Sequence, residues 1–209
     1  MVAVHLDIDT DHGPAGVELD RPRAARALVV LTHGAGGGVD TADLLAIRDA
    51  LTAARVAVAR VLQPYRVAGR RTPPKPAPQD AAWVQVVAAL RRRRGNAVLP
   101  LIQGGRSNGA RVACRTALTV GADAIVALAF PLHPPGRPQN SRLDELDGAG
   151  VPTLLVQGER DPFGMPPESA TRQRVVVPGA DHGLKRGTAE LAAAVRAFVL
   201  GQVEVLERA

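Results

Sequence analysis

The sequence has one cysteine, few aromatic residues and no long apolar run. The single cysteine, Cys114, excludes an intrachain disulfide framework. Aromatic residues make up 2% of the 209 residues, so the core must be built from Val, Leu, Ile and Ala. The longest apolar runs, such as 124–130, are too short to cross a bilayer, and the N-terminus lacks the basic start of a secretory signal. These absences predict a cytoplasmic protein without a membrane partner.

Lysine is also scarce, because Lys75 and Lys185 are the only two. Arginine therefore carries almost all of the positive charge behind the formal net charge of +6. The basic residues are spread along the chain and form no single stripe of the kind that binds nucleic acid. The run 91–94 is an exception, and it lies where a helix is expected to end, a place where cations complement the helix dipole. This distribution predicts no nucleic-acid partner.

Short apolar runs without alternation indicate strands that are buried on both faces. They occupy 27–32, 56–61, 97–103, 124–130, 152–157 and 174–177. Helical patterns lie between them, at 44–51, 80–93, 108–118 and 188–203. This alternation predicts right-handed crossovers and a parallel sheet. The segment 2–8 alternates with period two and 17–20 returns after a turn, which predicts an antiparallel hairpin. We expect a single α/β domain over 1–209, with a mixed, mostly parallel sheet of eight strands and helices on both faces.

Several local features qualify this pattern. Asp40 is expected to cap the helix that follows it. The proline-rich stretch 67–79 is expected to be a stiff surface loop, and 132–150 is long enough for a minimal lid but not for a cap domain. Pro100 lies inside a predicted central strand, where a residue without an N–H is disfavoured. The paired part of that strand is therefore expected to be short or to begin near Pro100.

The sequence Gly105-Arg-Ser-Asn-Gly109 lies between a predicted strand and a predicted helix. This is the context of a nucleophile elbow, in which the serine sits on a tight, strained turn with its hydroxyl clear of the sheet. Glycines on both sides leave room for the backbone to cross. Only three serines occur in the chain, and Ser107 is the one in this frame. We predict that Ser107 is the nucleophile of an α/β-hydrolase fold, against the alternative of an ordinary glycine-rich turn.

A second glycine-rich segment, 33–38, follows the first predicted parallel strand. The tetrahedral oxyanion of acyl transfer needs two backbone N–H donors. In this fold one comes from the residue after the nucleophile, here Asn108, and the other from a loop after an early strand. Ala35 is the preferred second donor, with Gly36 close behind. A nucleotide site is the alternative, but the full dinucleotide and Walker spacings are absent.

The order of the relay residues in this fold is serine, acid, histidine. Of the five histidines, only His182 follows the strand 152–157, and it lies in a predicted loop. Asp161 follows that strand and can orient His182. Glu159 lies too early in the loop, and Asp181 is better placed to shape the turn beside the histidine.

Five segments resemble small bacterial α/β-hydrolases of the KANSL3/Tex30-related, dienelactone-hydrolase-like family. They are 32–37, 104–111, 130–136, 157–164 and 180–185, and the resemblance runs from about residue 26 to the C-terminus. It implies a Ser107–Asp161–His182 triad and no cofactor. Dienelactone hydrolases proper use a cysteine nucleophile, so their lactone substrate does not transfer. Some eukaryotic relatives serve in protein complexes, so the resemblance does not by itself imply turnover.

These features predict a serine hydrolase that cleaves a small or medium ester, thioester or lactone through an acyl-enzyme. No cofactor or metal is expected, and the partners are a small-molecule acyl substrate and, at most, a second copy in a homodimer. His33, Arg106 and His133 are candidates for lining the substrate pocket, although a structural hydrogen bond explains His133 equally well. The alternative function is a catalytically silent scaffold with the same fold.

Overall fold

The computed structural model describes residues 2–208. This part of the chain contains eight strands and six helices. The strands are β1 (Val2–Ile8), β2 (Ala15–Arg21), β3 (Leu28–Thr32), β4 (Ala57–Leu62), β5 (Leu101–Arg106), β6 (Ala124–Leu128), β7 (Thr153–Gly158) and β8 (Arg172–Val177). The helices are α1 (Ala42–Ala53), α2 (Pro64–Val67), α3 (Pro76–Arg92), α4 (Asn108–Val120), α5 (Leu143–Asp147) and α6 (Thr188–Arg208).

All eight strands form one sheet in the order β1-β2-β4-β3-β5-β6-β7-β8. β1 pairs antiparallel with β2, and β2 pairs antiparallel with β4. The remaining neighbours pair in parallel. The predicted α/β fold with a mixed, mostly parallel sheet is therefore confirmed. β3 lies between β4 and β5, so the strand order reverses there: the chain passes from β3 to β4 on one side and then returns past β3 to β5 on the other. Ligands bind open α/β sheets at such a reversal.

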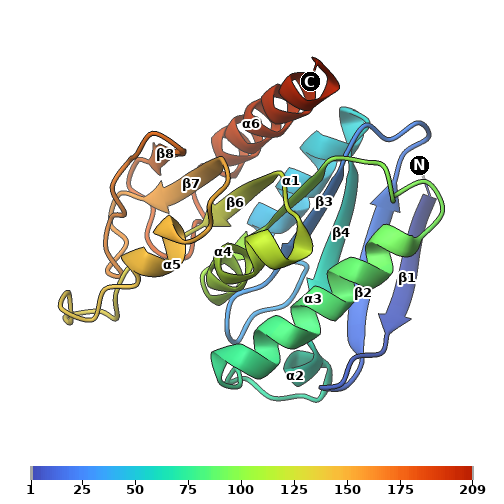
Figure 1. Cartoon of the computed structure of the whole chain (residues 1–209). Helices are drawn as coiled ribbons and strands as arrows, with labels where there is room; N and C mark the ends of the chain where they lie inside the picture. The colour runs from blue at the N-terminus through green and yellow to red at the C-terminus, as the bar shows by residue number, and fades with distance from the viewer. Residues whose placement is uncertain (1, 209) are drawn as a thin grey trace.

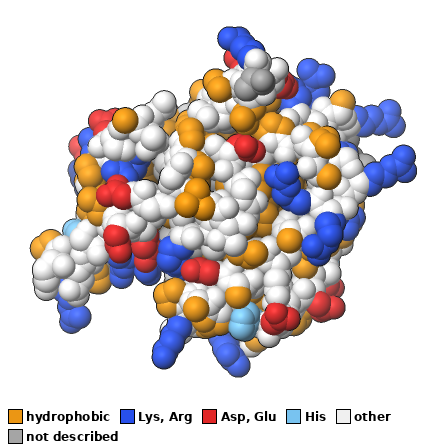
Figure 2. All heavy atoms as spheres, in the orientation of Figure 1, with side chains coloured by type: hydrophobic (Ala, Val, Ile, Leu, Met, Phe, Trp, Pro, Cys, Tyr) orange, Lys and Arg blue, Asp and Glu red, His pale blue; other side chains and the backbone are white. Residues whose placement is uncertain are grey.

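Helices cover both faces of the sheet (Figure 1). α1 and α6 pack together on one face, where Leu44 and Ile47 of α1 join Val195 and Val199 of α6 in one apolar cluster. α3 and α4 cover the other face, and α5 packs beside α4. The core is mainly aliphatic, as the shortage of aromatic residues requires. Within residues 2–208, no helix has the length and apolar character needed to span a membrane. Basic side chains lie scattered among apolar and acidic ones on the face shown in Figure 2.

Two local predictions are wrong. Asp40 does not cap α1, because Thr41 precedes the helix and Asp40 pairs with Arg60 at 2.7 Å. The proline-rich stretch is a shorter loop than predicted, since α2 ends at Val67 and α3 already begins at Pro76. Proline suits the first position of a helix, because an N–H at that position would have no acceptor within the helix.

The two remaining irregular segments border the sheet. β5 begins at Leu101, directly after Pro100, so the strand is short as expected. The carbonyl of Pro100 still accepts a hydrogen bond from the amide of Leu28 at 2.9 Å. The segment 132–150 carries α5, which packs against α4, and its exposed tip projects outward in Figure 1. A role for this segment as a minimal lid stays a prediction.

Candidate active site

Ser107 lies on the turn between β5 and α4, with φ +52° and ψ −111°. Residues other than glycine rarely adopt a backbone conformation with positive φ, so the turn is strained. Close backbone crossings explain the glycines on both sides. A Cβ at Gly105 would lie 2.7 Å from the carbonyl oxygen of Thr32, and one at Gly109 would lie 2.7 Å from that of His33. The amide of Ser107 donates to the carbonyl of Leu128 at 2.8 Å, which ties the turn to β6.

The imidazole of His182 bridges Ser107 and Asp161. It lies in the loop between β8 and α6, and its Nε2 is 2.9 Å from Ser107 Oγ. Its Nδ1 is 2.8 Å and 3.1 Å from the two carboxylate oxygens of Asp161. A carboxylate only accepts hydrogen bonds, so these partners assign the proton to Nδ1 and leave Nε2 free to accept from the serine hydroxyl. The side chain of His182 is 21% exposed, whereas that of Asp161 is fully buried.

Asp161 is held by further donors in the loop after β7. Gln157 Nε2 donates to Oδ2 at 2.8 Å, and the Phe163 amide donates to Oδ1 at 2.9 Å. The ring of Phe163 lies against that of His182, with centroids 4.2 Å apart. The other two nearby carboxylates have different partners: Glu159 accepts from the amide of Gly179, and Asp181 accepts from the amide of Gly183.

The glycine-rich loop after β3 lies beside the serine. A Cβ at Gly34 would be 3.5 Å from the Cβ of Ser107. Within the described residues, the amides of Ala35 and Gly36 donate to no protein acceptor. Two side chains fix the peptide groups that carry these amides. His33 Nδ1 bonds the carbonyl of Gly34 at 2.7 Å, and the Tyr65 hydroxyl donates to that of Ala35 at 2.6 Å. Because N–H and C=O point in opposite directions in a trans peptide, these bonds orient the amides of Ala35 and Gly36.

The prediction that His33 lines the substrate pocket is wrong, because its side chain is buried. The amide of Gln63 donates to Nε2 at 3.0 Å, so the ring proton is on Nδ1. Burial lowers the pKa of His33 to about 4, although the bond to Gly34 opposes this. His33 is therefore a neutral structural residue of the loop.

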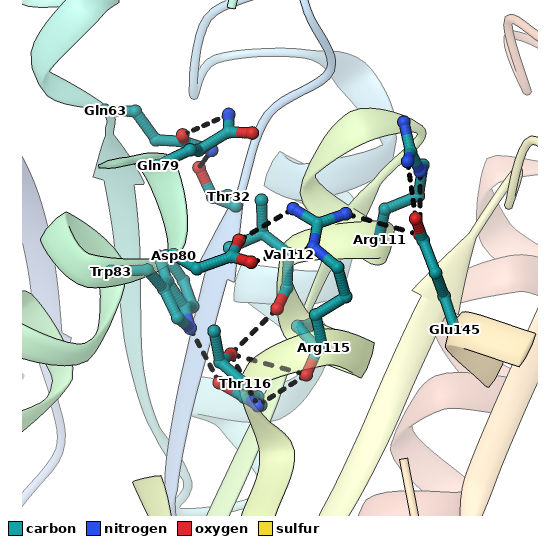
Figure 3. Close-up of polar contacts among 12 residues, drawn as sticks. Thr32, Gln63, Gln79, Asp80, Trp83, Arg111, Val112, Arg115, Thr116 and Glu145 are labelled. Atoms are coloured by element: carbon teal, nitrogen blue, oxygen red, sulfur yellow. Dashed lines mark hydrogen bonds and ion pairs between the residues drawn. The ribbon is translucent and has the colours of Figure 1, made fainter. Parts of the chain in front are cut away.

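Arg106 and Arg111 on either side of Ser107 both have protein partners. Arg106 Nη2 donates to the carbonyl of His182 at 2.8 Å, and its Nε is 3.2 Å from Asp43. Arg111 binds Glu145 of α5 through two nitrogens (Figure 3). These partners give Arg106 contacts within the protein, and its place in a substrate pocket stays a prediction.

His133 packs against the loop that carries Asp161. Its amide donates to the carbonyl of Phe163 at 3.0 Å, its ring Nδ1 bonds the carbonyl of Pro134 at 2.9 Å, and a Cβ at Gly164 would lie 2.5 Å from its Nε2. These contacts are the structural role considered for His133, and its place in a substrate pocket stays a prediction.

Sequence reasoning missed Gln63, Tyr65 and Gln157. Gln63 directly follows β4, and Gln157 is the penultimate residue of β7. A polar residue at the carboxyl end of an apolar strand was the available signal. Within residues 2–208, no three His, Cys, Asp or Glu side chains are grouped so that they could hold a metal ion.

Comparisons with known proteins agree with this architecture. Residues 25–194 match a family described as alpha/beta hydrolase domain (Abhydrolase_11). No curated protein sequence matches the chain. Among solved structures, Est1E from Butyrivibrio proteoclasticus superposes with a TM-score of 0.78 at 19% identity, over 96% of this chain and 99% of its own. XC6422 from Xanthomonas campestris, described as an a/b serine hydrolase without lid, gives 0.73 at 20% identity, over 94% and 93%. A dienelactone hydrolase from Anabaena variabilis gives 0.72 at 17% identity, over 95% and 94%. At these identities the likeness concerns the fold.

Proposed function

The chain belongs to the alpha/beta hydrolase domain family, and from this premise we propose that it is a serine hydrolase acting through an acyl-enzyme. The observation that carries the proposal is the continuous hydrogen-bond path from Ser107 through His182 to Asp161. A hydroxyl bonded to an imidazole, which is bonded in turn to a buried carboxylate, is the arrangement that activates serine as a nucleophile.

Acylation begins when Ser107 Oγ attacks the carbonyl carbon of the substrate. The hydroxyl proton passes to His182 Nε2, and Asp161 stabilises the imidazolium that results. The negative charge that develops on the substrate oxygen is held by the amides of Asn108 and Ala35, with Gly36 as the alternative second donor. The tetrahedral intermediate then collapses, the bond to the leaving group breaks, and His182 returns the proton to that group.

Deacylation repeats these steps with water. His182 takes a proton from water as its oxygen attacks the acyl carbon, and the bond to Ser107 Oγ breaks as His182 reprotonates the serine. The products are a carboxylic acid and the free enzyme.

The proposed substrate is a small or medium ester, thioester or lactone. The segment 132–150 contains only the short helix α5 and is too short for a cap domain that could build a deep tunnel for a long acyl chain. Within the family, the segments 130–136 and 157–164 favour the KANSL3/Tex30-related, dienelactone-hydrolase-like branch. A cytoplasmic location and a single domain that acts as a monomer or homodimer belong to the same proposal.

A fluorophosphonate probe tests the proposal, because it phosphonylates an activated serine with loss of fluoride. We expect the wild type to be labelled near neutral pH and Ser107→Ala to remain unlabelled. Ser141→Ala is the matched control, since Ser141 is exposed in the loop before α5, and it should be labelled like the wild type. On p-nitrophenyl esters of varied acyl length, Ser107→Ala should lower kcat on the order of 10⁶-fold. Absence of both labelling and hydrolysis in the wild type would favour the scaffold alternative.

A further inference from the structure

Arg106 is the last residue of β5, directly before Ser107, and its guanidinium group contacts three separate segments. Nη2 donates to the carbonyl of His182 at 2.8 Å. Nε lies 3.2 Å from Oδ2 of Asp43 in the first turn of α1. Nη1 lies against the glycine-rich loop after β3, because a Cβ at Gly34 would be only 3.7 Å from Nη1. One side chain thus joins the elbow to three segments: α1, the loop after β3, and the loop 178–187 between β8 and α6, which we call the histidine loop.

The Arg106–Asp43 pair lies inside the protein. The side chain of Asp43 is 3% exposed and that of Arg106 is 18% exposed. Asp43 also accepts from the amide of Leu44 at 3.0 Å, which fixes its carboxylate at the start of α1. The pair is held by the attraction of opposite charges, because neither Nε of Arg106 nor Oδ2 of Asp43 makes a well-aligned hydrogen bond. The fixed carboxylate therefore limits where the guanidinium group can lie, and with it the direction of its bond to His182.

The Arg106 bond holds the main chain at His182 itself, whereas neighbouring residues of the loop are held by bonds from the amide of Arg160 to the carbonyl of Ala180 and from the amide of Leu184 to the carbonyl of Asp181. Within the described residues, Arg106 is the only group that donates to the carbonyl of His182. The loop carries a strained residue two positions later, since Leu184 has φ +45°. Only the imidazole ring of His182 bonds Ser107 and Asp161. The position of the His182 backbone must therefore be fixed by other contacts. A charge-assisted hydrogen bond is about twice as strong as a neutral one.

We propose that Arg106 is a positioning residue that holds His182 at bonding distance from Ser107, through its hydrogen bond to the His182 carbonyl and its ion pair with Asp43. This inference rests on the proposed serine-hydrolase function. Arg106 directly precedes Ser107 in the chain. Its side chain therefore links the backbone of the serine to the backbone of the histidine. Arg106 touches neither Ser107 Oγ nor the ring of His182, so it acts on catalysis through geometry.

Arg111 provides a matched control. It also flanks the elbow, its side chain is 19% exposed, and it pairs with a carboxylate, Glu145. That pair joins α4 to α5 (Figure 3), and Arg111 has no hydrogen bond to the loop that carries His182 within the described residues. Loss of Arg111 thus removes a comparable buried ion pair and leaves the contact between Arg106 and His182 in place.

A cavity beside Arg106 makes chemical rescue feasible. It has a volume of about 430 Å³, and its walls include Thr41, Asp43, Arg106 and residues 183–185. The hydroxyl of Thr41, Oδ2 of Asp43 and Nε of Arg106 are buried there without a well-aligned hydrogen bond. If Arg106 is shortened to alanine, a free guanidinium ion has room to enter and a carboxylate to bind.

The first experiment measures ester hydrolysis by Arg106→Ala and Arg111→Ala. We expect kcat of Arg106→Ala to fall on the order of 10²-fold with little change in KM, because misplacement of a catalytic group by about 1 Å has an effect of that size. Guanidinium chloride should restore kcat, whereas equal concentrations of sodium chloride or urea should not. Arg111→Ala should stay near wild-type kcat and gain nothing from guanidinium. Equal losses in both variants, or a loss in Arg106→Ala that guanidinium does not reduce, would overturn the proposal.

A second measurement works without turnover. In the wild type, the proton on His182 Nδ1 that is bonded to Asp161 should give a downfield NMR resonance. We expect this resonance to broaden or vanish in Arg106→Ala and to persist in Arg111→Ala; its persistence in both would overturn the proposal. If Arg106→Ala does not fold, Arg106→Lys replaces it, because one ammonium group cannot bond both partners of the guanidinium fork. An inactive wild type that keeps the resonance would refute the proposed hydrolase but not the positioning contact.

Discussion

Two loops at the carboxyl edge of the sheet each carry a histidine with both ring nitrogens hydrogen-bonded. In the loop after β3, His33 bonds only main-chain groups, the carbonyl of Gly34 and the amide of Gln63, and its side chain is buried. In the loop after β8, His182 bonds the side chains of Asp161 and Ser107 and stays partly exposed. The first ring has neither a group to activate nor a place for substrate. The second ring has a hydroxyl on one side and a buried carboxylate on the other, so a proton taken from the hydroxyl is stabilised.

The loop after β3 contributes hydrogen-bond donors to the site. His33 and Tyr65 orient the peptide groups that present the amides of Ala35 and Gly36. One loop therefore supplies a rigid set of donors, while the other supplies a base that can exchange protons with substrate and water. Exposure and the type of hydrogen-bond partner, rather than residue type, separate the two roles.

Replacing each histidine by glutamine should produce the largest difference between the loops. His182→Gln removes the base, so kcat for ester hydrolysis should fall on the order of 10⁶-fold. His33→Gln can keep one accepting and one donating bond. Its kcat should therefore remain within about tenfold of the wild type, which is the effect expected from the loss of one hydrogen bond. Both variants should be compared with the wild type under the same assay. Similar losses of kcat in the two variants would remove the distinction between a structural and a reactive histidine.

The residues at this edge differ in how far sequence alone could predict them. The order serine, acid, histidine, together with parallel strands that end at one edge, pointed to Ser107, Asp161 and His182, and the structure brings these side chains together. Sequence could not predict the roles of His33 and Arg106, because strand periodicity places a residue at an edge without fixing the direction of its side chain.

Two other differences between the sequence predictions and the structure concern Asp40 and the segment 67–79. Asp40 has the residue type of a helix cap, but a buried arginine from β4 binds it instead. The prolines of 67–79 suggested a loop throughout, although proline is also compatible with the first turn of a helix. In both cases the local pattern allowed two structures, and contacts from distant segments or the helix start selected one of them.

Acidification should reveal the buried histidine through stability. The pKa of His33 in the folded protein is about 4, against an ordinary value of 6.5, because its ring is buried. As pH falls through 6.5, the unfolded chain takes up a proton at this site, whereas the folded chain does so only near pH 4. Stability is therefore lost across this window, by about 3 kcal/mol for this site. Urea unfolding of the wild type between pH 7 and pH 4 measures the slope.

His33→Gln does not titrate at this position, so its unfolding free energy should depend less steeply on pH in the same window. His12→Gln is the control, since His12 is exposed, and it should retain the wild-type slope. Parallel slopes for the wild type and His33→Gln would show that His33 is not held neutral by the fold.

The smallest expected effect concerns the hydroxyl that orients the amide of Gly36. Burial raises the pKa of Tyr65 to about 12, so this hydroxyl stays protonated and donates to the carbonyl of Ala35. Tyr65→Phe removes only this bond, and kcat should fall by about tenfold with KM unchanged, because the donor is needed most when the oxyanion forms. Thr116→Val is the control, since it deletes a buried hydroxyl that bonds within α4 (Figure 3), and its kcat should match the wild type. An unchanged kcat in Tyr65→Phe would indicate that the loop after β3 is rigid without this bond, and would leave His33 as the side chain that sets its geometry.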